Sequence, residues 1–170
     1  MAVEYDDIIV GGGSSGAVLA ARLSEDPERR VLLLEAGPDF QSVESTPHDL
    51  LNGRSMSLAT HDWGFTAEAM PGRSIIYPRG KATGGSSAVN ATVALRGNPS
   101  DYDEWAALGN DGWSWEQVLP FFRKLEDDQD RSGDWQGKGG PVRIRRWRPE
   151  EIRPIQRAFY DVCLRMGFPE

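Results

Sequence analysis

Residues 7–16 read DIIVGGGSSG, a short apolar run that ends in a glycine-rich turn. A second apolar run, VLLL at 31–34, is followed by Glu35 and Ala36. Between the two runs, residues 14–23 are rich in Ala and Leu, which favour a helix, and residues 24–30 are polar. This order predicts a βαβ unit with two buried, parallel strands.

The glycines of this unit have the spacing of a dinucleotide-binding turn. Gly11, Gly13 and Gly16 form a G-x-G-x-x-G pattern directly after the first strand. The first glycine permits a tight turn, the second lets a pyrophosphate approach the backbone, and the third lets the helix pack against the strand. The amides of Ser14 and Ser15 would then face the pyrophosphate at the positive end of the helix. This motif alone does not separate FAD from NAD.

An acidic residue closes the second strand. Glu35 comes about 20 residues after the last glycine, where a carboxylate can accept hydrogen bonds from ribose hydroxyls. Its charge would repel a 2′-phosphate, which argues against NADP. We therefore expect Glu35 and Ala36 to contribute to the cofactor site.

Composition excludes several other partners. The 170 residues include 19 basic and 26 acidic side chains, a formal net charge of −7. Phosphate backbones and anionic lipids are therefore not expected ligands. The acidic amino terminus is unlike a secretory signal, and no apolar run approaches the roughly 20 residues that span a bilayer, so we expect a cytoplasmic protein. Cys163, His48 and His61 lack metal-ligand spacing, and Cys163 is expected to be buried in a helix.

The remainder of the chain predicts shorter elements. Residues 38–70 show no sustained periodicity, which predicts a long irregular connection, and a short strand is expected at 74–77. S-x-x-D/Q patterns typical of helix starts, at 100–103 and 114–117, predict helices near 101–107 and 115–126. Pro120 lies deep in the second of these, so a kink or split is expected there. A strand at 141–144 and a helix at 152–166 follow.

Several conspicuous side chains are assigned to structure rather than chemistry. Neither histidine has a recognisable partner base in the sequence, so no catalytic residue is assigned to either. The tryptophans at 105, 113 and 115 fall at helix starts and turns, where packing is the commoner use. The arginines at 143, 145, 146 and 148 are expected to form ion pairs.

A second glycine-rich loop, RGKATGGSSAVN at 79–90, runs into ATVALRG at 91–97. Together with residues 7–16 it closely resembles the first signature of the glucose-methanol-choline (GMC) oxidoreductases. This family includes choline, glucose and aryl-alcohol oxidases and related dehydrogenases. Further similar segments lie at 62–63, 98–105, 112–115, 118–124 and 139–142.

The resemblance implies an FAD site. In the family, the loop matching 84–90 lies along the pyrophosphate and isoalloxazine, and the segment matching 90–93 touches the flavin ring. Amides aimed at the ring would stabilise the negative charge that develops on reduction. The additional cofactor contacts implied are Trp63, Arg79, Thr83, Gly84, Gly85, Ser87, Asn90, Ala91, Thr92 and Val93.

Two residues depart from the family pattern. Thr83 stands where an aliphatic residue is usual, which leaves the glycines intact. Val89 stands where members with covalent flavin carry the attaching histidine. Because valine cannot form that bond, the expected cofactor is non-covalent FAD.

The resemblance also implies a reaction. It is the oxidation of a primary or secondary alcohol by hydride transfer to flavin N5, with oxygen or a quinone as electron acceptor. The family's catalytic histidine lies beyond residue 170, so the 170-residue chain alone is expected to be inactive. The alternatives are a fragment of an NAD-dependent Rossmann dehydrogenase and a truncated, non-catalytic product.

The predicted fold is α/β, a Rossmann-like FAD-binding domain with a parallel sheet. It is expected to be incomplete at its C-terminal side, because only two parallel strands are evident. The predicted parts are a βαβ unit at 1–37, an irregular connection at 38–72, a flavin-contacting loop and helix at 73–97, and helical segments with a short strand at 98–170 that lead towards a substrate domain.

Overall fold

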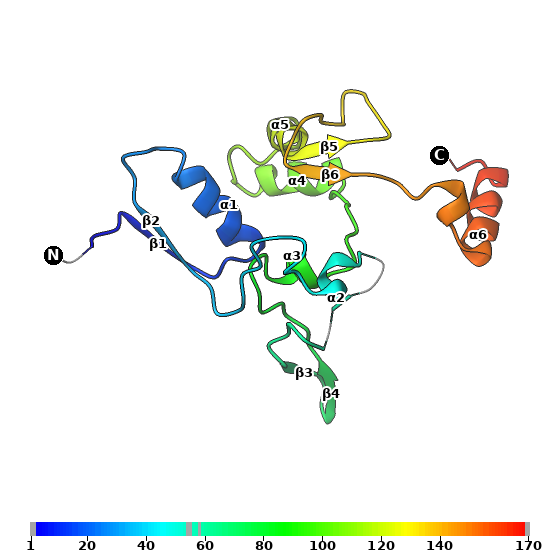
Figure 1. Cartoon of the computed structure of the whole chain (residues 1–170). Helices are drawn as coiled ribbons and strands as arrows, with labels where there is room; N and C mark the ends of the chain where they lie inside the picture. The colour runs from blue at the N-terminus through cyan, green and yellow to red at the C-terminus, as the bar shows by residue number, and fades with distance from the viewer. Residues whose placement is uncertain (1–2, 54–55, 58, 169–170) are drawn as a thin grey trace. The chain divides into compact units, whose positions relative to one another are not determined.

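The computed structural model describes residues 3–53, 56–57 and 59–168. The chain divides into two compact units, Met1–Val93 and Ala94–Glu170, and each is described by itself (Figure 1). Over the described residues, no helix has the length and apolar character needed to cross a membrane.

The first unit begins with the predicted βαβ arrangement. Strand β1 (Asp7–Val10) pairs in parallel with β2 (Val31–Leu34), with Asp7 opposite Val31 and Val10 opposite Leu34. Helix α1 (Ser14–Leu23) connects the strands and packs against both (Figure 1). The prediction of a parallel βαβ unit is confirmed.

The expected burial of these strands is wrong for this chain. Ile8 is 60% exposed and Val10 is 83% exposed, whereas Ile9, between them, is half-buried. Successive side chains of a strand point to opposite faces, and α1 packs beside Ile9. One face of the pair is therefore covered, and the other is open to solvent.

The middle of the chain is more regular than predicted. Strand β3 (Thr66–Met70) pairs antiparallel with β4 (Arg73–Ile76) around a turn in which Gly72 has φ +75°. The second strand confirms the one expected at 74–77, but β3 falls inside the segment predicted to be irregular. In its sequence, TAEAM, every second residue is an alanine, and such small side chains give little hydrophobic signal. Two one-turn helices, α2 (His48–Leu51) and α3 (Ser86–Val89), complete the unit.

The second unit contains the predicted helices. Helix α4 (Pro99–Ala107) begins at a capping box formed by Asn98 and Asp101, two residues before the expected start at Ser100. Helix α5 (Trp115–Leu125) has the expected capping box. The last two helical elements are the 3₁₀ turn η1 (Pro149–Glu151) and α6 (Pro154–Arg165). Cys163 lies on α6 but is half-buried, not buried as predicted.

Pro120 does not split its helix. It is the sixth residue of α5, which is one helix from Trp115 to Leu125. The missing N–H deprives only the carbonyl of Glu116 of its partner. Because Glu116 is exposed, water can satisfy that carbonyl. The helix is therefore not split at Pro120.

A parallel pair of short strands was only half predicted. Strand β6 (Val142–Ile144) was expected, but its partner β5 (Glu126–Asp128) was not. The acidic sequence of β5 lacks a strand signal, and yet Glu126 is 6% exposed and Asp128 is 2% exposed. Arginines neutralise both carboxylates, because Arg96 lies 2.5 Å from Glu126 and Arg146 lies 2.8 Å from Asp128.

Aromatic rings pack together beside these strands. Trp115 contacts Trp135, Tyr102 and Phe122, with ring centroids 4.9–6.1 Å apart. Trp105 packs edge-to-face on Trp113 at 5.5 Å. The packing role predicted for the tryptophans at 105, 113 and 115 is confirmed.

Candidate functional site

The two glycine-rich loops, about 70 residues apart in the sequence, pack directly on each other. The Gly84 N–H donates to the Gly12 carbonyl at 2.8 Å, and the hydroxyls of Ser14 and Ser87 are hydrogen-bonded. A Cβ on Gly85, which has φ +54°, would lie 2.8 Å from the Cα of Gly13. Only glycine allows this approach, so the two motifs form a single site.

The first loop holds α1 close to β1. A Cβ on Gly16 would lie 1.9 Å from the Gly11 carbonyl oxygen and 3.2 Å from Ile9 Cγ2. Gly11 itself has φ +96°, in the left-handed region that suits glycine. The turn and packing roles predicted for these two glycines are confirmed.

The second loop is fixed from its other side. A Cβ on Gly37 would lie 2.2 Å from the Lys81 carbonyl, so the end of the β2 turn lies directly against this loop. The Thr83 N–H donates to Pro38 O at 3.0 Å. Ala82 and Val89, 1% and 6% exposed, are the buried apolar side chains of the described residues. The buried apolar side chains of the first unit's described residues therefore lie within this loop.

Glu35 is held by backbone amides. Its Oε2 accepts the Gly12 N–H at 2.7 Å, and its Oε1 accepts those of Gly37 at 2.8 Å and Ala36 at 2.9 Å. These bonds, that of Gly37 first, hold the pKa of the Glu35 carboxyl below its usual value, against the opposing effect of burial. The carboxylate is therefore ionised at neutral pH, and Oε2 keeps a lone pair for a further donor.

A cavity of about 790 Å³ opens between the two loops. Its walls come from the turn after β1, the end of β2, Trp63 and the second loop. The lining residues are Val10, Gly11, Gly13, Ser14, Ser15, Gly16, Leu34, Glu35, Ala36, Trp63, Arg79, Gly80, Gly85 and Ser86.

Most of the predicted site residues meet at this cavity. Four lining residues were not predicted: Val10, Leu34, Gly80 and Ser86. Val10 and Leu34 could have been found, since ligands of parallel sheets bind at the carboxyl ends of the strands. The predicted residues that do not line it are Thr83, Gly84, Ser87, Asn90, Ala91, Thr92 and Val93.

The base of the β3–β4 hairpin brings Trp63 and Arg79 to the cavity. The Trp63 N–H donates to Arg79 O at 3.0 Å, and Asp62 Oδ1 accepts the Arg79 N–H at 2.6 Å. The Lys81 ammonium lies 4.7 Å from the centre of the Trp63 ring. The Asp62 carboxylate therefore holds the two chain segments at the base of the hairpin together, which gives the aspartate before Trp63 a structural role.

The histidines lie outside the cavity. His61 Nδ1 is 2.7 Å from Thr60 Oγ1 and 3.8 Å from Asp49 Oδ2, and its ring packs against Phe40. His48 is the first residue of α2. Within the described part of the chain, no group of His, Cys, Asp or Glu could hold a metal ion.

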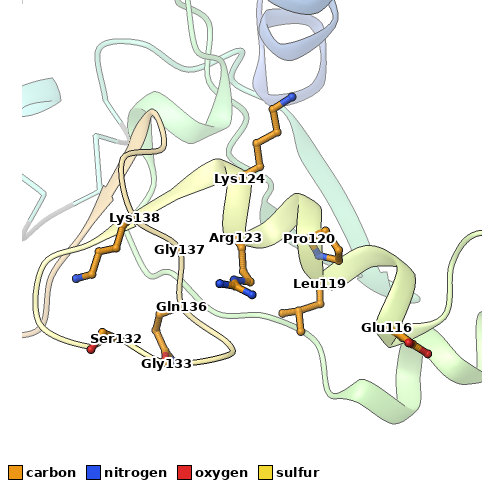
Figure 2. A pocket seen from close by; sticks show the side chains of 10 residues that line it. All are labelled: Glu116, Leu119, Pro120, Arg123, Lys124, Ser132, Gly133, Gln136, Gly137 and Lys138. Carbon is orange, nitrogen blue, oxygen red and sulfur yellow. The ribbon is translucent and has the colours of Figure 1, made fainter.

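The second unit has a hollow of its own, of about 670 Å³ (Figure 2). It lies between α5 and the loop at 132–138, and the Arg123 side chain projects from α5 towards this loop. None of the residues of the two glycine loops line it. The two hollows therefore have no lining residue in common.

Comparison with known proteins agrees with this geometry. The profile of the family described as GMC oxidoreductase matches residues 5–170. The chain is 38% identical over 170 residues to oxygen-dependent choline dehydrogenase from Brucella ovis, an alignment that covers 98% of this chain and 30% of the relative. The chain thus spans less than a third of that protein.

Two solved structures are similar to this one. Pyridoxine 4-oxidase from Mesorbium loti has a TM-score of 0.84 and 38% identity, over 98% of this chain and 33% of its own. An FAD-dependent oxidoreductase from Chaetomium thermophilum has a TM-score of 0.74 and 32% identity, over 98% and 30%. The α/β flavoprotein fold predicted from the sequence is confirmed. Because the family profile spans nearly the whole chain and the solved structures share its fold, this chain belongs to the GMC oxidoreductase family.

Proposed function

We propose that this chain supplies FAD-binding elements of an oxidoreductase that oxidises a primary or secondary alcohol. The observation that carries the proposal is the packing of two glycine loops around one cavity, with Glu35 on its wall. A nicotinamide dehydrogenase would account for the first loop but would leave the second without a role. The relatives are named for choline and pyridoxine, which both carry hydroxyl groups.

The residues at the cavity fit a dinucleotide. Gly13 precedes α1 without a side-chain cap, so the amides of the first turn need an acceptor, which a pyrophosphate provides. Nothing lies within 4 Å of a Cβ built on Gly11, so the backbone there is open to a ligand. Glu35 Oε2 would accept a hydrogen bond from a ribose hydroxyl, and Trp63 lies on the cavity wall.

FAD, when bound, accepts the hydride of the alcohol at N5. This chain's residues would bind and orient the cofactor: α1 its pyrophosphate, Glu35 its ribose and 90–93 its ring. The proposed electron acceptor is oxygen or a quinone. Because neither histidine lines the cavity, we propose no catalytic residue in this chain and expect no turnover from the 170 residues alone.

A binding experiment tests the proposal. The purified protein is mixed separately with FAD and NAD and passed through gel filtration. The protein fraction is examined by visible absorption for flavin, and the nucleotide that acid releases from it is analysed by chromatography for NAD. We expect flavin absorption to co-elute with the protein and NAD to be lost. Retention of NAD but not FAD would favour the nicotinamide class, and retention of neither would favour a non-catalytic product.

Replacing Glu35 is expected to weaken FAD binding. Glu35→Ala removes the acceptor of three backbone N–H groups as well as the ribose contact, a loss of about 1–3 kcal/mol. Glu35→Gln keeps one oxygen, but its NH₂ must face one of those donors, so we expect a smaller but measurable loss. The measurement is a fluorescence titration of FAD with each variant.

The matched control for Glu35→Gln is Glu28→Gln, which makes the same charge change at an exposed position. Thermal melts of wild type and Glu35→Ala over a range of pH add a second test. Because the pKa of Glu35 is lower in the folded protein, the ionised carboxylate stabilises the fold above the unfolded pKa of about 4.3. This stabilisation of the folded protein is lost as pH falls through the folded pKa. FAD affinity equal in wild type and both Glu35 variants would show that Glu35 is not the ribose ligand.

We propose that the flavin is held without a covalent bond. Val89, at the position of the attaching histidine in covalent relatives, is 6% exposed and has no nucleophilic atom. Acid precipitation of the holoprotein is therefore expected to release all flavin into the supernatant. A covalent flavoprotein treated in parallel provides the control, and a yellow pellet would contradict the prediction.

A further inference from the structure

Thr92 has an unusual backbone conformation. Its φ is +53°, and no other residue except glycine has a positive φ among those that the structure describes. The left-handed region is sterically unfavourable for a β-branched residue. Such conformations persist only where the surroundings hold them, and they cluster at functional sites.

Two hydrogen bonds hold this conformation. The Thr92 N–H donates to Asn90 Oδ1 at 2.8 Å, and the Thr92 hydroxyl donates to the Gly53 carbonyl at 3.0 Å. A Cβ on Gly53 would lie 2.9 Å from Thr92 Oγ1, so glycine is required for this approach. The side chain of Thr92 thus ties its own backbone to a distant part of the chain.

The other end of this short segment is tied to the same region. The Ser57 N–H donates to the Val89 carbonyl at 3.1 Å. Ser57 is 5% exposed, and its hydroxyl donates to Asp49 Oδ2 at 2.5 Å. Residues 89–92 are therefore held at both ends against backbone that α2 anchors.

We propose that Thr92 is a positioning residue for the flavin, a role that rests on the function proposed above. Its hydroxyl bond to Gly53 holds the backbone in the left-handed region and so fixes the direction of the peptide between residues 92 and 93. Because 90–93 is the segment proposed to face the flavin ring, the bond sets how its amides meet the ring. Without the hydroxyl, the segment relaxes towards an ordinary conformation, and the amides turn away.

Three variants of the FAD-loaded protein separate the hydroxyl from shape and strain. Thr92→Val keeps the shape and loses the hydroxyl, Thr92→Ser keeps the hydroxyl, and Thr92→Gly favours the observed φ but loses the bond. The control is Thr66→Val, which makes the same change as Thr92→Val at an exposed position of β3. The measurements are the FAD dissociation constant, the visible circular dichroism of the flavin, its midpoint potential and the thermal melt.

The valine variant is expected to bind FAD about three- to tenfold more weakly, the effect of one hydrogen bond. Its flavin dichroism and midpoint potential should change, whereas Thr92→Ser and Thr66→Val should match wild type. The glycine variant should show the same flavin changes without a lower melting temperature.

If Thr92→Val leaves affinity, dichroism and potential unchanged in a wild type that binds FAD, the positioning role is wrong and the proposed function stands. If the valine change lowers only the melting temperature, the role is merely structural, which also overturns the inference. A wild type that binds no FAD overturns the proposed function itself.

Discussion

Replacing Gly16 with alanine is expected to separate α1 from β1 and to abolish FAD binding. The added methyl group would lie 1.9 Å from the Gly11 carbonyl oxygen, which is backbone and cannot rotate away. Relieving such a contact requires the helix to shift, at a cost of about 1–3 kcal/mol. A thermal melt of the protein and a titration with FAD are the measurements.

Gly13→Ala separates packing from cofactor binding. A Cβ there would be 3.8 Å from Gly85 Cα, an ordinary contact, and its φ of −77° suits alanine. We therefore expect a melting temperature close to that of wild type but little FAD binding, because the methyl group occupies the path of the pyrophosphate. Normal FAD affinity in the Gly13 variant would place the pyrophosphate elsewhere, and a stable, FAD-binding Gly16 variant would refute the packing argument.

The local parts of the site could be predicted from the sequence. The strand, the glycine turn and the helix follow one another directly in the chain. The spacing of the glycines in the sequence is therefore enough to predict where Gly11 and Gly16 lie in this unit. The contact between Gly13 and Gly85 is different, because no spacing rule brings residues so far apart together. Only the family resemblance pointed to the second loop, and the hydrogen bond from Gly84 to Gly12 gives the physical reason that it belongs to the same site.

Elements whose stability depends on distant partners escaped prediction. Strand β5 has the sequence EDD, which by itself favours solvent, and its burial depends on Arg96 and Arg146 from elsewhere in the chain. The open face of β1 is a similar case, since hydrophobicity predicts burial but cannot say what covers the strand. The left-handed conformation of Thr92 was not predicted either, because one of the two hydrogen bonds that hold it is made to the distant carbonyl of Gly53.

Asp128→Ala is expected to destabilise the second unit strongly. The Asp128 side chain receives two bonds from the Arg146 guanidinium, at 2.8 and 3.0 Å, and the backbone N–H groups of Asp130 and Arg131 at 3.0 and 2.9 Å. Alanine leaves all these donors without their acceptor. Because the Arg146 side chain is 43% exposed, water compensates for part of the loss, and we expect about 2–3 kcal/mol. A melt should show a decrease of about 10 °C or more.

The dependence of this loss on pH identifies its cause. The bonds from Arg146, assisted by the amides of Arg131 and Asp130, hold the pKa of the Asp128 carboxyl well below its usual value. The stabilisation is therefore complete above the unfolded pKa of about 3.9 and is lost as pH falls through the folded value. The gap between the melting temperatures of wild type and Asp128→Ala should accordingly narrow below about pH 4. Asp134→Ala, at an exposed position of the same unit, should show no gap at any pH. A gap for Asp128→Ala that stayed constant into strong acid would mean that lost packing, and not the ion pair, causes the instability.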